Sequence, residues 1–195
     1  MPLGAQILDV GCWSGFNGRH LAATRGAVMD GIEPVHAMAR IAAQTYRRVH
    51  ATSVEAAIDG PLAETADYDV LLLLDVLEHL VDPATVLRRL RDSVGPGGIA
   101  LVSLPNVAHW SVRKELALGR FTYTPSGLLD ATHLRFFTMP SGAALIGDAG
   151  WQITWRSVSL DRPPVVPLRG RWLRPLGRWP GLFAVQMLFE IRPIA

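Results

Sequence analysis

The sequence predicts an α/β protein with a doubly wound, mainly parallel sheet, and two observations lead to this prediction. Short apolar runs alternate with stretches of helical pattern along the whole chain, without repeats or low-complexity tracts. One of these runs, residues 68–74, is apolar almost without interruption and is bounded by acids, which is typical of a central strand buried on both faces. At 195 residues the chain has the length of one domain with one substantial core.

The chain opens with a βαβ unit that ends on an acid. An apolar strand over residues 5–10 runs into a turn of mostly small residues at 11–15, and a helix is expected over 17–24. A second strand over 27–32 is followed directly by Glu33. Glycine backbone can approach a ligand closely, and a carboxylate at the tip of the second strand can accept hydrogen bonds from ribose hydroxyls. The unit therefore predicts a nucleoside site.

Trp13 limits the kind of nucleoside. A dinucleotide turn reads G-x-G-x-x-G, and Trp13 stands where that pattern has its second glycine. A pyrophosphate needs close backbone approach at this point, so the bulky side chain argues against NAD or FAD. A nucleoside without phosphates fits the turn better.

Further strands and helices follow in alternation. Asp82 and Pro83 suit the N-cap and the first position of one of these helices. The expected elements are a helix over 37–45, strands over 46–50 and 68–74, a helix over 83–90, a turn at 95–98, a strand over 99–104, a helix over 140–149, and strands over 151–160 and 181–191.

Four segments in this order resemble the class I S-adenosylmethionine-dependent methyltransferases. They are LDVGCWSG at 8–15 with GIEP at 31–34, DVLLLLDVLEHLVDP at 69–83, GPGGIALVSLPN at 95–106 and LDATHLRFFT at 129–138. The last resembles a bacterial subgroup that often acts in sugar, glycan or secondary-metabolite pathways. The resemblance implies a seven-stranded Rossmann-like sheet, S-adenosylmethionine as methyl donor and S-adenosylhomocysteine as product.

The resemblance also implies a set of cofactor-binding residues. Asp9 and Gly11 would approach the methionine portion, Glu33 the ribose, and Asp75 the methionine portion or the methyl group. Glu33 can instead be a helix N-terminal acid, and Asp75 a cap for the next turn. Where Ser53 stands, the family more often has aspartate. The full set is Asp9, Gly11, Cys12, Gly15, Glu33, Pro34, Ser53, Val54, Asp75 and Val76.

Residues 105–140 are expected to form an acceptor-side insertion, between a cofactor-binding half (1–104) and a C-terminal part (141–195) of a single domain. Ligands of open α/β sheets bind beyond the carboxyl ends of the strands, where this insertion begins. Its arginines can grip a phosphate or carboxylate and its aromatic residues can stack on a sugar, or both can simply coat and underpin an exposed segment. The substrate-binding candidates are Asn106, His109, Trp110, Arg113, Arg120, Tyr123 and Arg135.

Methyl transfer to oxygen benefits from a base with a pKa near neutrality, for which histidine is suited. His133 is the first candidate because it lies in the acceptor-side segment, and His79 is the second. Each has a structural alternative: His133 can pin its loop, and His79 can begin a helix. The six histidines show no zinc-ligand spacing and Cys12 is the single cysteine, so we expect no metal.

The composition of the chain limits the kinds of partner and the cellular location to be expected. Residues 151–195 hold 7 Lys or Arg against 2 Asp or Glu, and the loop 161–180 suits a lid, an interface or a binding role. Residues 169–178 raise the alternative of membrane attachment. We expect no nucleic acid partner, no transmembrane segment, no signal peptide and a location in the reducing cytoplasm. The chain can act as a monomer or as a homodimer that shields the cofactor.

The sequence thus predicts a methyltransferase that methylates an oxygen of a small acceptor such as a sugar, nucleotide-sugar or secondary metabolite, anionic or glycosylated. N-methylation is the nearest alternative. Trp13 and the short segment before the first strand favour a different class, a non-catalytic methyltransferase-like domain that binds or assembles with a partner.

Overall fold

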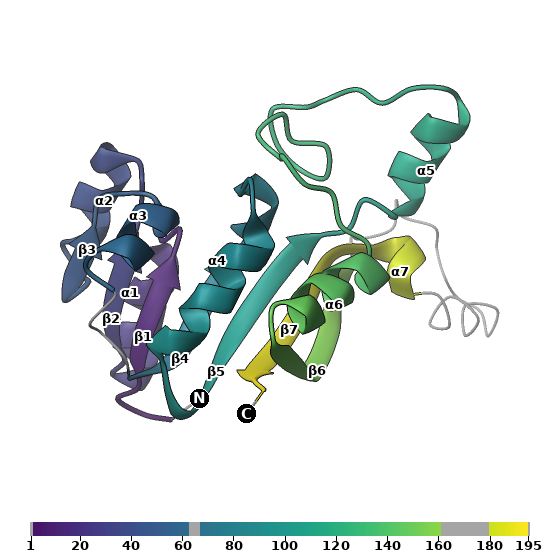
Figure 1. The fold of residues 1–195 in the computed structure, drawn as a ribbon. Coiled ribbons are helices and arrows are strands. Elements are labelled where there is room, and N and C mark those ends of the chain that lie inside the picture. The colour runs from purple at the N-terminus through teal and green to yellow at the C-terminus, as the bar shows by residue number, and fades with distance from the viewer. Residues whose placement is uncertain (1, 63–66, 161–179, 195) are drawn as a thin grey trace.

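The computed structural model describes residues 2–62, 67–160 and 180–194 of the chain and places seven strands in one sheet (Figure 1). The strand order is β3-β2-β1-β4-β5-β7-β6; β7 runs antiparallel to both of its neighbours and the other pairs are parallel. The doubly wound, mainly parallel sheet expected from the sequence is confirmed. The strands are β1 (Gln6–Val10), β2 (Val28–Ile32), β3 (Arg48–His50), β4 (Tyr68–Leu74), β5 (Val94–Pro105), β6 (Trp151–Leu160) and β7 (Ala184–Pro193).

Helices cover both faces of the sheet because successive residues of the buried strands point to opposite faces. In β1, Leu8 and Val10 belong to one apolar cluster, which includes residues of α3, α4 and α6, while Ile7 belongs to a second cluster beside α1 and α2. The helices are α1 (Phe16–Arg25), α2 (His36–Ala42), α3 (Val54–Asp59), α4 (Pro83–Arg89), α5 (Trp110–Ala117), α6 (Met139–Asp148) and α7 (Pro180–Phe183), with short 3-10 turns η1 (Leu77–His79) and η2 (Leu90–Ser93).

Some helices and strands begin where the sequence predicts, and others do not. Asp82 caps α4 as expected, since its Oδ1 accepts a 3.0 Å hydrogen bond from the Thr85 amide. The third strand begins later than predicted, at Arg48. Tyr46 lies before it and turns inward, where its hydroxyl accepts a 3.2 Å bond from the Gly18 amide.

The turn predicted at 95–98 is instead part of β5. Tyr68 pairs with Val94 and Val70 with Ile99, so the extra residues of β5 are absorbed by a shift of register. The strand predicted over 181–191 begins at Ala184, after α7. Two helices were not predicted: α3 is too short to show a helical period, and α5 lies in the segment interpreted as an irregular insertion. Of the loop 161–180, residues 161–179 lie outside the described residues.

The carboxyl ends of β1, β2 and β4 meet at one edge of the sheet, and the chain between β5 and α6 stands beyond the end of β5 (Figure 1). None of the described helices is long and apolar enough to cross a membrane.

Candidate functional site

Two non-glycine residues at the carboxyl ends of neighbouring strands have left-handed backbone conformations. Trp13, after β1, has φ 48° and Asp75, after β4, has φ 57°. Such conformations cost about 1–2 kcal/mol in a residue with a side chain, and they gather at ligand sites. The two positions mark this edge of the sheet as the candidate site.

The turn after β1 needs its glycines. Gly11 and Gly15 have φ 69° and 77°, and a Cβ atom on Gly11 would lie 2.8 Å from Val76 Cγ2. The amides of Gly11 and Cys12 donate to the Ile32 carbonyl at 2.8 and 3.1 Å, which holds the turn against β2. Both glycines therefore have a structural reason, whether or not a ligand is bound.

Glu33 fixes the same turn from the end of β2. Its carboxylate is 3% exposed; Oε2 accepts from the Trp13 amide at 2.9 Å and Oε1 from the Val35 amide at 2.8 Å. The helix-terminus interpretation is thus satisfied, because Val35 precedes α2. A carboxylate has about four acceptor positions, so two remain for the hydroxyls of a ligand.

Asp9 and Cys12 lie beneath the turn. Asp9 is 2% exposed, and its Oδ2 accepts a 2.6 Å bond from the Tyr46 hydroxyl. Burial raises the pKa of Asp9 to about 6, and the charge of Glu33 adds to the rise while the Tyr46 bond opposes it. The Cys12 thiol is directed under Gly31, where a Cβ atom would be 2.7 Å from its sulfur, and burial raises its pKa to about 12. The thiol is therefore unreactive, and the turn can offer a ligand only the backbone of Cys12.

The other predicted cofactor residues follow β2 and β3 at the same edge. Pro34 is exposed, next to Glu33. The Ser53 hydroxyl accepts a 3.3 Å bond from the Ala56 amide and caps α3, and Val54 packs into the core. Ser53 thus already has a structural partner, which explains the residue type at this position.

Hydrogen bonds from residues of β5 and β7 hold the side chain of Asp75. Its amide donates to Ser103 Oγ at 3.0 Å, and its Oδ1 accepts from Ser103 Oγ at 2.7 Å and from Gln186 Nε2 at 2.6 Å. The alternative role of Asp75 as a simple turn cap does not describe these bonds. Gln186 was not among the predicted site residues, although a glutamine within the apolar run of β7 could have indicated it.

A cavity of about 290 Å³ opens beside Asp75, beyond the ends of β4 and β5 and the start of β7. It brings together both predicted catalytic histidines and Asp75. Its lining residues are Asp75, Glu78, His79, Pro105, Gly127, Leu128, Asp130, His133, Val185 and Gln186.

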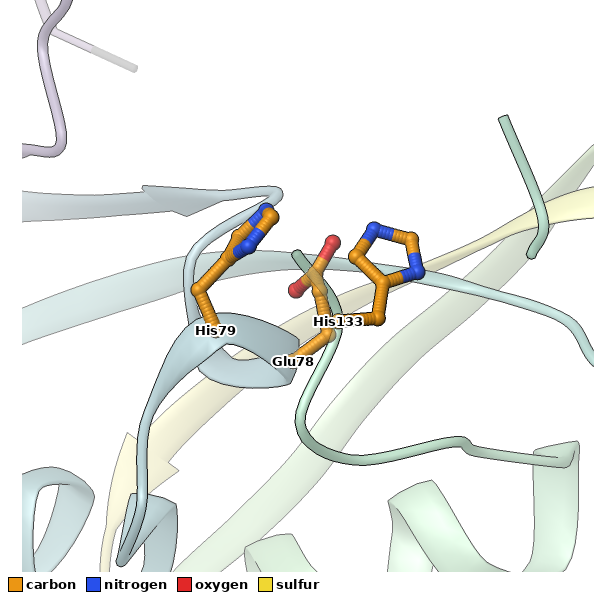
Figure 2. A group of neighbouring side chains, drawn as sticks. All are labelled: Glu78, His79 and His133. Carbon is orange, nitrogen blue, oxygen red and sulfur yellow. The ribbon is translucent and has the colours of Figure 1, made fainter. Parts of the chain in front are cut away.

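Glu78, His79 and His133 form the polar centre of this cavity, and Figure 2 shows their side chains gathered above η1. One nitrogen or carboxylate oxygen of each lies within 4.8 Å of those of the other two, a grouping that is also dense enough to hold a metal ion. The two imidazole rings meet edge to face, with centroids 4.9 Å apart. Glu78 was not among the predicted site residues, because its position next to His79 indicated only the start of a helix.

The loop that carries His133 is fastened to η1. The amides of Leu134 and Arg135 donate to the Glu78 carbonyl at 2.8 and 3.0 Å, and His79 Nδ1 lies 3.2 Å from the Thr132 carbonyl oxygen. These contacts fix the position of His133 relative to Glu78.

Burial determines the protonation of Glu78 and His133. Glu78 is 1% exposed, and burial raises its pKa to about 8, with Asp75 adding to the rise. The pKa of His133 is lowered, first by burial and then by the neighbouring His79. His133 is therefore a neutral imidazole at neutral pH and can accept a proton.

Asn106 and His109 build the base of the acceptor-side segment. Asn106 is 1% exposed; its Nδ2 donates to the carbonyls of Gly181 and Ala184, both at 2.8 Å. His109 is buried at the start of α5, with Nδ1 2.8 Å from Ser111 Oγ, and Trp110 tilts against its ring. Neither Asn106 nor His109 lines the cavity.

The three candidate arginines of this segment bind the chain itself. Arg113 Nε donates to the Ala108 carbonyl at 2.6 Å, Arg120 Nε to Glu115 at 2.6 Å, and the Arg135 guanidinium to the Val81 carbonyl at 2.6 Å. Tyr123 packs edge to face on Phe121, with ring centroids 5.5 Å apart. The structure does not bring these side chains into the cavity.

Comparison with known proteins gives the family. A family model described as a methyltransferase domain matches residues 2–154. The chain is 33% identical over 178 residues to a ubiquinone biosynthesis O-methyltransferase of Azorhizobium caulinodans, covering 87% of this chain and 66% of the relative. It is 34% identical over 108 residues to a protein of the same name from Vibrio vulnificus, covering 53% and 45%. The chain thus spans less than two thirds of the length of these relatives.

Solved structures agree on the fold at low identity. A TehB-like SAM-dependent methyltransferase from Corynebacterium glutamicum superposes with a TM-score of 0.61 and 16% identity, covering 99% of this chain and 82% of that one. Magnesium protoporphyrin IX methyltransferase from Synechocystis, with bound SAM, gives 0.60 and 14%, covering 99% and 71%. Since the family model matches well over half of the chain, this chain belongs to the methyltransferase domain family and has the fold of its S-adenosylmethionine-dependent members.

Proposed function

We propose that the chain transfers a methyl group from S-adenosylmethionine to an oxygen of a small acceptor held in the cavity beside Asp75. One observation supports this most directly: a single residue, Val76, links the wall of the cavity to the turn after β1. Val76 follows the cavity-lining Asp75 and reaches to within 2.8 Å of where a Cβ on Gly11 would lie. A donor on that turn and an acceptor in the cavity would be neighbours, as an in-line displacement requires.

The residues at the turn suit S-adenosylmethionine. Glu33 keeps two acceptor positions for ribose hydroxyls, and Gly11 allows close backbone approach. Asp9 places a carboxyl group under the turn, where the positive charge of the donor would favour its ionised form. The bound donor supplies a methyl group already activated on a sulfonium, so the chain's task is alignment and exclusion of water.

His133 is the proton acceptor in this proposal. Its Nδ1 is buried and, among the described residues, has no hydrogen-bond partner. A neutral imidazole at this position would take the proton of the acceptor hydroxyl as the methyl group is transferred. His79 keeps its place as the second candidate, with a positioning role through Thr132.

The names of the relatives favour oxygen over nitrogen as the methylated atom. The acceptor class, whether sugar, nucleotide-sugar or secondary metabolite, stays a prediction, as do a homodimer, a cytoplasmic location and a single domain with its acceptor-side segment at 105–140. A non-catalytic binding domain is the contrary outcome of the test below.

The test compares wild type with His133→Gln and with His20→Gln, a substitution on α1 far from the cavity. Formation of S-adenosylhomocysteine is measured with panels of hydroxylated sugars and aromatic compounds. We expect His133→Gln to lower the rate by about 10²–10⁴-fold with unchanged donor affinity, because general-base catalysis has this magnitude. Equal rates in the three proteins would refute the role of His133. Donor binding without transfer to any acceptor would favour the non-catalytic domain.

A further inference from the structure

The cavity has more hydrogen-bond acceptors than donors. Three buried polar atoms on its wall have no hydrogen-bond partner within the described chain: Glu78 Oε2, His133 Nδ1 and Gln186 Oε1. Glu78 is also the most deeply buried of these residues, at 1% exposed. Buried polar atoms are nearly always paired, so three orphans around one cavity indicate a ligand that supplies hydrogen atoms.

The wall is also acidic. Asp75, Glu78 and Asp130 line it, and no lysine or arginine of the described ranges does.

The existing hydrogen bonds leave one carboxylate oxygen of Asp75 and one of Asp130 available. Asp75 accepts hydrogen bonds from Ser103 Oγ and Gln186 Nε2, both on Oδ1. Asp130 accepts hydrogen bonds from the Thr132 amide at 2.8 Å and from the Thr132 hydroxyl at 2.7 Å, again both on Oδ1. Gln186 donates through Nε2 to Asp75, which fixes its amide and leaves Oε1 as an acceptor on the wall.

We propose that the acceptor substrate carries an ammonium group, which binds among Glu78, Asp75 and Gln186 while a hydroxyl of the same molecule is methylated. An ammonium has three donors and no acceptor, which matches a wall of orphan oxygens, and its charge matches the carboxylates. This inference rests on the proposed function, because it names the substrate class of that site. It favours amino alcohols, amino sugars and aminated phenols over the anionic acceptors considered from the arginine content.

Proton linkage gives the inference a signature. The groups that face the ammonium are Glu78, Asp75, Asp130, His79 and His133. Burial raises the pKa of Glu78 to about 8, so a bound cation must displace its proton at neutral pH. Affinity should rise about tenfold per pH unit between pH 6 and 8, as expected when one proton leaves on binding. Proton loss from the His133 imidazole changes the affinity in the same direction.

The test is calorimetric binding of three probes that share a phenol ring and differ only in the group at the end of a short chain. Tyramine carries an ammonium, para-ethylphenol no charge and para-hydroxyphenylacetate a carboxylate. We expect tyramine to bind at least tenfold more tightly than para-ethylphenol, and para-hydroxyphenylacetate to bind most weakly. Equal affinities, or no tyramine binding at millimolar concentration, would overturn the inference.

Variants locate the preference. Glu78→Gln keeps the side-chain shape and should abolish the advantage of tyramine, and Asp130→Asn should reduce it. Asp148→Asn, at the end of α6 and away from the cavity, should leave it unchanged. Retention of the full preference in Glu78→Gln would contradict the inference, as would its loss in Asp148→Asn.

A metal ion is the competing cation, so each titration is repeated with EDTA and with Mg²⁺ or Zn²⁺ alone. The inference requires the tyramine preference to persist in EDTA. Binding of the metal ion that Glu78→Gln abolishes, with no preference for tyramine, would overturn it in favour of a metal site. Because binding is read without turnover, failure of methyl transfer with an intact tyramine preference would count against the proposed function alone.

Discussion

The hydroxyl of Tyr46 donates a 2.6 Å hydrogen bond to Oδ2 of Asp9, in the buried space under the turn that follows β1. The same hydroxyl accepts from the Gly18 amide in α1 at 3.2 Å. One phenol oxygen thus joins β1, α1 and the chain between α2 and β3. The ring also fills the space next to Gly15 and Gly18, where a Cβ atom would lie 2.9 and 2.2 Å from it. Tyr46 therefore holds the turn in the shape proposed to receive the cofactor.

Replacement of Tyr46 by phenylalanine should destabilise the fold by about 1–3 kcal/mol, because it leaves a buried carboxyl group and a buried amide without a partner. Urea denaturation measures the change. Tyr123→Phe is the matched control, since Tyr123 is 53% exposed, and it should change the free energy of unfolding by less than about 0.5 kcal/mol. Similar values for the two variants would show that the Tyr46 hydroxyl carries no structural role.

The pH dependence of stability should report Asp9. Burial raises its pKa from 3.8 to about 6, so the folded state holds a proton between these values that the unfolded state has released. The contribution of Asp9 to stability is therefore fully present below pH 4 and is lost as pH rises through 6, by about 3 kcal/mol in total. The free energy of unfolding of wild type minus that of Asp9→Asn, measured from pH 4 to 7, isolates this group. A difference independent of pH would contradict the assignment.

Trp13 is placed at a cost to stability. Its φ of 48° strains a residue with a side chain, and its side chain is 59% exposed, so little packing compensates. Trp13→Gly should raise the free energy of unfolding by up to about 1 kcal/mol, since relief of strain exceeds the entropy that glycine adds to the unfolded chain. Ser14→Gly, in the same turn but without positive φ, should lower it by about 0.5–1 kcal/mol. A loss of stability in both variants would show that the Trp13 side chain packs more favourably than its exposure indicates.

The fold was largely predictable from sequence because its signals are local. The apolar run of β4 and the cap of α4 by Asp82 depend on residues close together in the chain. The start of β3 was not predictable, because Tyr46 is apolar enough to extend a strand pattern and is taken instead by contacts with Asp9 and Gly18. Helix α5 was not predicted because its apolar pattern is weak and its N-cap, His109, is not a common capping residue.

The candidate site was predictable only in part, for a related reason. Asp75 and His133 stood out by position in motifs, but their grouping with Gln186 joins segments far apart in sequence. Glu78 was overlooked because the loop that covers it comes from a distant part of the chain. The amides of Leu134 and Arg135 bond to the Glu78 carbonyl, and a pattern within one segment cannot reveal such a contact. The arginines were overvalued for a different reason: hydrogen bonds to nearby residues of the chain already engage them, as in the pair of Arg120 with Glu115.

Calorimetric titration shows whether the turn and Glu33 form an S-adenosylmethionine site. Wild type and Glu33→Ala are titrated with S-adenosylmethionine and S-adenosylhomocysteine, with NAD as control ligand. We expect micromolar binding of the first two ligands by wild type, no binding of NAD, and a loss of about ten- to a hundredfold in Glu33→Ala, the value of charge-assisted hydrogen bonds to ribose. Asp148→Asn should bind like wild type. Absence of binding by folded wild-type protein, or equal affinity in Glu33→Ala, would show that the turn and Glu33 do not form this site.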